Sequence, residues 1–118
     1  MFLVFLLTFG PFLHLINASG EEFFWRGYLL DGLTARFGER TANIGSAVAW
    51  GAWHIPMVVM IGWVFPQPLL GSVLFTISLT SWGIVLGYLR QKDRSLWIPI
   101  AMHAVANAFT VGFYDLIA

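Results

Sequence analysis

Four short polar clusters interrupt a chain that is otherwise apolar. They lie at residues 17–20, 38–41, 65–68 and 90–95. The segments between them are long enough for helices and do not show the recurring ten-residue alternation of apolar and polar residues that a transmembrane β-barrel needs. We therefore predict an all-α fold with helices near residues 1–16, 20–36, 42–63, 68–90 and 96–115.

The surface of such a fold cannot face water. The chain has 118 residues, of which 58% are hydrophobic and 10% charged, whereas a soluble domain carries about a quarter charged residues. Helices satisfy their own backbone hydrogen bonds in lipid. We predict a polytopic transmembrane bundle of about four to five helices, forming one domain over residues 1–118.

The charged residues are informative through their positions. Six basic and six acidic residues give a net charge of zero, so the sequence has no basic footprint for nucleic acid. Arg36 and Arg40 flank one predicted loop, and the basic residues at 90–94 crowd another, two membrane crossings later. The positive-inside rule predicts that both loops are cytoplasmic.

Two adjacent carboxylates and an arginine stand in an apolar neighbourhood after the first cluster. Glu22 precedes Arg26 by four residues, the favourable order for a helical ion pair. Ser19 and Glu22 also match a capping box, which would make this stretch an ordinary helix start. Glu21 points about 100° away and has neither role, so it is the better candidate for chemistry.

Polar residues on the later helices are predicted to reach the same depth. A rise of 1.5 Å per residue places Glu22 about 21 Å from Arg36, inside a hydrocarbon core of about 30 Å. His54 lies at a similar depth, although a packed histidine beside Pro56 is the plainer alternative. A polar helix seam is the alternative for His103 and Asn107.

These residues form a three-part pattern. It consists of Glu-Glu-x-x-x-Arg at 21–26, an aromatic-x-x-x-His at 50–54 and His-x-x-x-Asn at 103–107. The pattern resembles the signature of the CAAX protease and bacteriocin-processing (CPBP, or Abi) family of intramembrane peptidases. The second motif has Trp50 where the family more often has Phe, and we expect the domain to lack the upstream helices common in full-length members.

The resemblance implies an intramembrane endopeptidase that hydrolyses a peptide bond in a membrane-associated or lipidated protein. Glu21, helped by His54, is expected to activate water, while His103 and Asn107 stabilise the oxyanion. Glu22 and Arg26 support the motif. The substrate class implied is either a CAAX-type tail or a bacteriocin-related peptide, with processing or self-immunity as the role.

A zinc mechanism is the main chemical alternative. Glu21, His54 and His103 can supply three protein ligands to a catalytic zinc, but the sequence has no His-Glu-x-x-His pair, and we favour a glutamate mechanism without a metal cofactor. The chain has no cysteine, which excludes a thiolate nucleophile. His14 is expected to be interfacial or packed rather than part of the site.

A function without catalysis is the remaining alternative. A membrane scaffold, an immunity factor that acts by binding, or a proton-relay module of a transporter also explains polar side chains within the bilayer. None of these explains why an acid, an acid–arginine pair and a His/Asn pair occur together in that order. The sequence does not indicate an oligomeric state.

Overall fold

Four helical runs make up the part of the chain that the structure describes. The computed structural model describes residues 2–61 and 66–117, in which every regular element is helical, so the all-α prediction is confirmed there. The elements in order are α1 (Phe2–Glu22), η1 (Phe23–Leu29), α2 (Leu30–Phe37), α3 (Glu39–Trp53), α4 (Ile55–Ile61), α5 (Pro68–Asp93) and α6 (Trp97–Ile117).

The first run is continuous where the sequence predicts a break. α1, the π-helical segment η1 and α2 follow one another without a loop, so the predicted interruption at 17–20 is wrong. The Ser19 hydroxyl does not cap a new helix but donates a hydrogen bond to the Leu15 carbonyl of the preceding turn, at 2.7 Å. Glu21 and Glu22 therefore lie within a helix, directly before the π-helical turn.

The second run is interrupted where the sequence predicts one helix over 42–63. α3 ends at Trp53 and α4 begins at Ile55, while residues 62–63 fall outside the described part. Pro56 has no N–H to offer the carbonyl four residues earlier. The backbone tightens instead, and the His54 N–H bonds to the Gly51 carbonyl at 3.1 Å.

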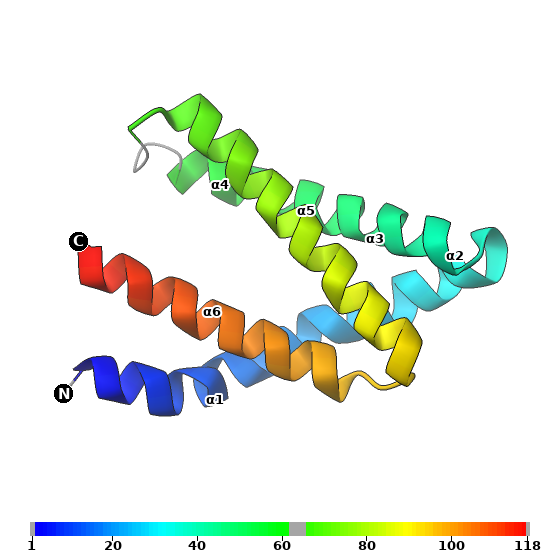
Figure 1. Ribbon diagram of the computed structural model, residues 1–118, viewed down its shortest axis with the longest axis horizontal. Coiled ribbons are helices and arrows are strands. Elements are labelled where there is room, and N and C mark those ends of the chain that lie inside the picture. The colour runs from blue at the N-terminus through cyan, green and yellow to red at the C-terminus, as the bar shows by residue number, and fades with distance from the viewer. Residues whose placement is uncertain (1, 62–65, 118) are drawn as a thin grey trace.

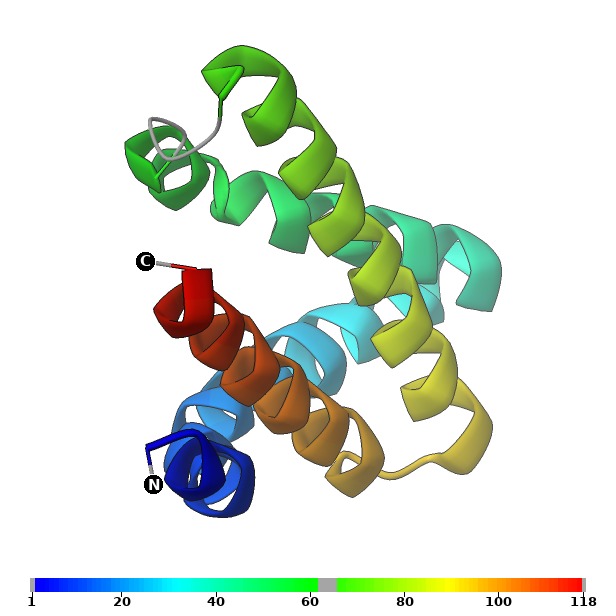
Figure 2. The same ribbon diagram turned by 60° about the vertical axis from the view of Figure 1, so that its left-hand side comes forward.

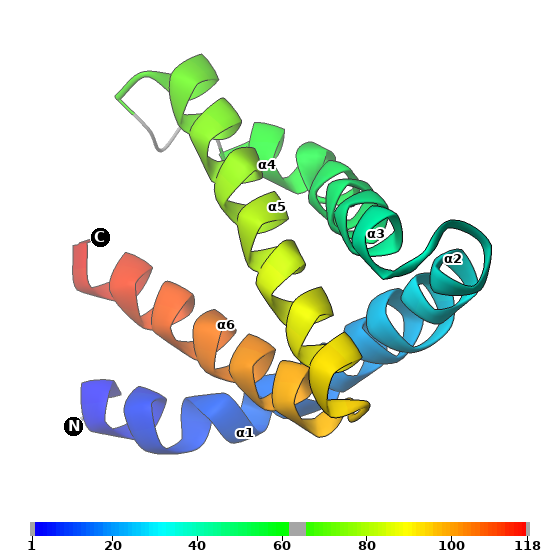
Figure 3. The same cartoon turned by 45° about the vertical axis from the view of Figure 1, so that its right-hand side comes forward.

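The helices pack in two groups. α1 and α6 lie side by side and antiparallel, with both chain ends at the same end of the molecule (Figure 1). α3 packs on α5 and α2 packs on α3. Seen from the side, the α1/α6 pair and the helices α3, α4 and α5 diverge toward the chain ends (Figure 2). α5 runs between α3 and α6 and contacts both (Figure 3).

Glycines allow α3 and α5 to approach closely. A Cβ added to Gly83 of α5 would lie 3.0 Å from a ring carbon of Trp50 and 3.2 Å from the Ala47 Cα. Gly51 of α3 is equally restricted, because its added Cβ would meet Thr80. Small residues of this kind let helix backbones pack directly together in a membrane.

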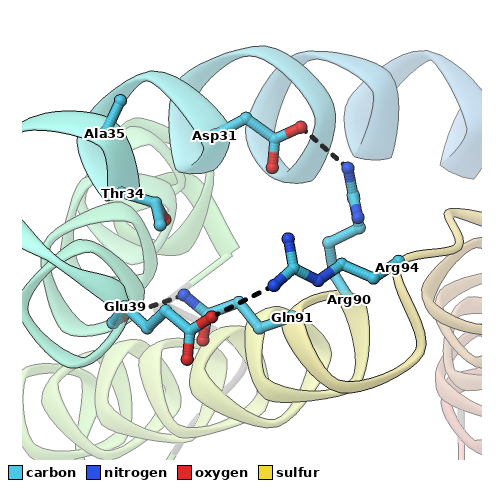
Figure 4. Close-up of a pocket in the computed structure, with 7 residues that line it drawn as sticks. All are labelled: Asp31, Thr34, Ala35, Glu39, Arg90, Gln91 and Arg94. Carbon is cyan, nitrogen blue, oxygen red and sulfur yellow. Dashed lines mark hydrogen bonds and ion pairs between the residues drawn. The ribbon is translucent and has the colours of Figure 1, made fainter.

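Polar contacts tie the α2–α3 turn to the end of α5. Arg90 pairs with Asp31 at 2.7 Å and Arg94 with Glu39 at 3.6 Å, and the Gln91 amide donates to the Glu39 carbonyl at 2.8 Å (Figure 4). The two basic loops therefore lie at the same end of the molecule, as the count of two crossings predicts. Their cytoplasmic placement stays a prediction.

The exterior is apolar along several helices. Ile16, Tyr28, Leu69 and Trp97 each expose about three quarters or more of their side chains. In the part of the chain that the structure describes, α5 is the helix long and apolar enough to cross a membrane, with a mean hydropathy of 1.9 over an 18-residue window. The number of crossings beyond α5 stays a prediction.

Enlarging Gly83 should loosen the α3–α5 contact. We expect Gly83→Leu to destabilise the protein by about 1–3 kcal/mol, because the new side chain must displace Trp50 and the α3 backbone. Gly32→Leu is the matched control, since nothing lies within 4 Å of a Cβ at that position. Thermal unfolding midpoints in detergent test this, and equal midpoints for the two variants would show that the close approach is not required.

Candidate active site

A cavity of about 640 Å³ lies between the two groups of helices. Side chains from α1, α3, α4, α5 and α6, together with His54 at the α3–α4 break, line it. Four of the residues predicted to form the site face it: Glu21, His54, His103 and Asn107. The structure therefore brings together residues that are more than 80 positions apart in the sequence.

Glu22 lies behind this cavity in the protein interior. Its side chain is fully buried, and Oε1 accepts a hydrogen bond from Arg26 Nη1 at 2.8 Å. The same oxygen lies 2.7 Å from His103 Nδ1. An ionised Glu22 accepts both bonds, so one carboxylate oxygen holds a cation of its own helix and an imidazole of α6.

Arg26 extends this buried network to two more helices. Its Nη2 lies 3.4 Å from the Gly83 carbonyl of α5, which accepts the contact. The guanidinium also lies over the Trp50 ring of α3, 4.5 Å from its centroid, in a cation–π arrangement. The expected pairing of Glu22 with Arg26 is present, and the pair connects α1, η1, α3, α5 and α6.

Trp50 separates the buried pair from the cavity. Its indole N–H donates to Glu21 Oε2 at 3.0 Å. Its ring meets His54 and His103 edge-on, with centroid distances of 4.8 Å and 5.5 Å. A phenylalanine at this position, as is common in the family pattern, has no N–H and cannot orient Glu21 in this way.

His54 is held in one tautomer. Its Nδ1 lies 2.8 Å from the Trp50 carbonyl oxygen. A carbonyl only accepts, so Nδ1 must carry the proton and, in the neutral ring, Nε2 keeps a lone pair. The helix break before Pro56 positions this ring, which is 8% exposed and lines the cavity opposite α1.

The sequence interpretation missed several polar residues of this cavity, among them Asn17 and Thr110. His14 was expected to be interfacial or packed, but it lines the cavity together with Asn17. Both lie on the α1 face that carries Glu21, at spacings of three and four residues. That spacing was readable from the sequence, but the predicted break at 17–20 concealed it.

Metal ligation does not fit this arrangement. Within residues 2–61 and 66–117, no group of three His, Cys, Asp or Glu side chains is placed to hold a metal ion. The three ligands considered for zinc were Glu21, His54 and His103. They share the cavity but do not form such a group.

Comparisons with known proteins agree with the three-part pattern. Residues 3–109 match the sequence model of a family described as type II CAAX prenyl endopeptidase Rce1-like. A protein of Methanococcus maripaludis named CAAX prenyl protease 2 is 31% identical over 101 residues, which cover 81% of this chain and 37% of that relative. The matched stretch is thus well under half of the relative's length. No solved structure matches.

The two adjacent glutamates should differ sharply in their effect on stability. We expect Glu22→Gln to cost about 3 kcal/mol or more, because it leaves the buried Arg26 charge without a counter-ion. Glu21→Gln should cost less than about 1 kcal/mol, since the amide oxygen still accepts the Trp50 N–H. Unfolding of both variants in the same detergent is the measurement. Equal losses would contradict the assignment of Glu22 to the interior and Glu21 to the cavity.

Proposed function

Since the chain belongs to the type II CAAX prenyl endopeptidase family, we propose that it hydrolyses a peptide bond of a membrane-associated or lipidated protein. The observation that carries the proposal is the position of Glu21. Its carboxylate lines a cavity that His54, His103 and Asn107 also line, and the Trp50 indole holds one of its oxygens. An acid, two imidazoles and an amide around one space suit acyl transfer to water.

Glu21 is the proposed general base. The Trp50 N–H occupies Oε2, which leaves Oε1 to accept a proton from water. The His54 Nε2 lone pair accepts the second water proton in a hydrogen bond, because Nδ1 is bound to the Trp50 carbonyl. Water held between two acceptors is oriented and made more nucleophilic, and Glu21 can afterwards give its proton to the leaving amine.

His103 and Asn107 are the proposed donors to the oxyanion. They stand one helical turn apart on α6 and both line the cavity. With its Nδ1–H donated to Glu22 Oε1, His103 in its protonated form can donate a second N–H, at Nε2, to the oxyanion. The Asn107 amide supplies a neutral donor. Donors fixed before the reaction stabilise the developing charge without reorganisation.

Glu22 and Arg26 are positioning residues in this scheme. They do not line the cavity, and their contacts run to His103, Trp50 and the α5 backbone. A small error in the His103 ring plane would misdirect its oxyanion donor, because such donors act over about 2.7–3.1 Å. The buried pair keeps that plane constant.

We further propose that the substrate is a CAAX-type prenylated tail rather than a bacteriocin precursor. The name of the Methanococcus maripaludis relative supports this choice. The apolar exterior and the long apolar α5 favour a protein that meets its substrate at a membrane. The basic turns near Arg36 and Arg90 would then face the cytoplasm, according to the positive-inside rule.

Loss of the general base should abolish cleavage while the protein stays folded. We expect Glu21→Gln to lower kcat by about 10²–10⁴-fold, the usual contribution of a positioned base. The test is cleavage of a panel of membrane-tethered peptides, prenylated and unprenylated, by the purified chain in liposomes, with and without excess chelator. The Glu39→Gln variant is a matched control, because that carboxylate is exposed at the far turn.

The outcomes separate the proposals. Activity that survives the chelator and disappears in Glu21→Gln supports the glutamate mechanism. Activity lost with the chelator and restored by zinc would overturn it in favour of a metal mechanism. If no peptide is cut and Glu21→Gln still acts in the cell like the wild type, the protein is a binding, immunity or proton-relay module instead. Cleavage confined to unprenylated peptides would overturn the substrate proposal alone.

The indole N–H of Trp50 should matter for the chemical step. We expect Trp50→Phe to lower kcat by about tenfold or more, because a hydrogen bond to a charged acceptor contributes about 1.5–3 kcal/mol. KM should change little. Trp97→Phe is the control, since that side chain is 74% exposed. Unchanged kcat in Trp50→Phe would show that the bond to Glu21 has no part in catalysis.

A further inference from the structure

The cavity continues past Glu21 between two matching rows of polar side chains. On α1 the row consists of His14, Asn17 and Glu21; on α6 it consists of His103, Asn107 and Thr110. The spacings are three then four residues in the first row and four then three in the second. Each row therefore follows one face of its helix.

The two rows run side by side in opposite directions. α1 and α6 are antiparallel neighbours (Figure 1). The contact between Glu22 and His103 aligns them at one end, so Glu21 lies at the His103 end and His14 at the Thr110 end. Seven residues of helix make each row about 10.5 Å long.

The groups beyond the catalytic residues have hydrogen-bonding capacity to spare. His14 and Asn17 make no hydrogen bond to another side chain among the described residues, and Asn17 is exposed to the cavity. The Thr110 hydroxyl donates to the Ala106 carbonyl at 2.8 Å, so its oxygen is free to accept. An amide offers a donor and an acceptor together, as does a neutral imidazole.

We propose that His14, Asn17 and Thr110 bind the main chain of the substrate in an extended conformation. This inference rests on the proposed peptidase function. A peptide within an apolar cavity needs partners for each N–H and C=O, because no bulk water supplies them. The two rows supply donors and acceptors in a line that begins at the reacting atoms.

The geometry also sets the length of peptide that is bound. An extended chain advances about 3.3 Å per residue. Asn17 lies four residues, or about 6 Å, from Glu21 and so meets the second residue from the scissile bond. His14, at about 10.5 Å, meets the third. Substrates shorter than three residues on the bound side cannot reach His14.

A length series tests this with the best-cleaved peptide of the panel. His14→Ala and Asn17→Ala should each raise KM by about fivefold, the loss of one net hydrogen bond, with kcat within about twofold. The effect of His14→Ala on KM should vanish when the peptide is shortened to two residues on one particular side of the scissile bond. The side on which this happens is thereby identified as the side that the two rows bind. Ile16→Ala is the matched control, because Ile16 is 83% exposed on another face of α1.

Crosslinking tests the placement without relying on turnover. The chain has no cysteine, so Asn17→Cys and Ile16→Cys can each be introduced into the Glu21→Gln background. A peptide carrying a bromoacetyl group two residues from the scissile position should label Asn17→Cys at least fivefold more than Ile16→Cys.

The two experiments distinguish failure of this inference from failure of the peptidase proposal. Normal cleavage with unchanged KM in both alanine variants, or equal labelling of the two cysteines, overturns the peptide-binding rows and leaves the peptidase intact. Selective labelling of Asn17→Cys, when the chain with Glu21 intact cuts no peptide of the panel, supports the rows and overturns the peptidase.

Discussion

The arrangement of the whole site depends on one buried carboxylate oxygen. Glu22 Oε1 accepts from Arg26 on its own helical run and from His103 on α6, and Arg26 in turn reaches the Gly83 carbonyl and the Trp50 ring. Burying such a pair costs several kcal/mol in desolvation, so an apolar core of the same shape would be at least as stable. What the pair provides is connection, because its contacts join α1, η1, α3, α5 and α6 around the site.

Two adjacent glutamates acquire different roles from this packing. Successive helical residues point about 100° apart, so Glu22 faces the interior while Glu21 faces the cavity. Trp50 lies between them, with its ring against the Arg26 guanidinium and its N–H on Glu21. A buried carboxylate and a carboxylate that lines the cavity thus stand side by side in one turn of helix.

The sequence predicted which ionisable side chains lie together better than it predicted the path of the chain. Spacings of four residues were enough to pair Glu22 with Arg26 and to place His103 and Asn107 on one face. The break expected at 17–20 was wrong, because serine and glycine signal a loop in water but are tolerated inside a helix when the hydroxyl bonds back to Leu15. The π-helical turn after Glu22 has no distinctive composition, and the role of the Trp50 N–H depends on a contact across 29 residues that no local pattern encodes.

The recurring interval of four residues has a physical reason in each motif. In the first, it lets Arg26 hold Glu22; in the second, it lets the Trp50 carbonyl fix the His54 tautomer at the end of α3. In the third, it sets His103 and Asn107 side by side along the cavity. In the first two motifs, the interval joins a polar side chain to the group that orients it: Glu22 to Arg26, and His54 to the Trp50 carbonyl. In the third motif, the interval repeats a polar group along one face of α6, and Thr110 continues that row by one more turn. On α1, His14 and Asn17 form a similar row with Glu21. The helical repeat that assembles the proposed catalytic groups is therefore also the repeat that places further polar groups along the same cavity.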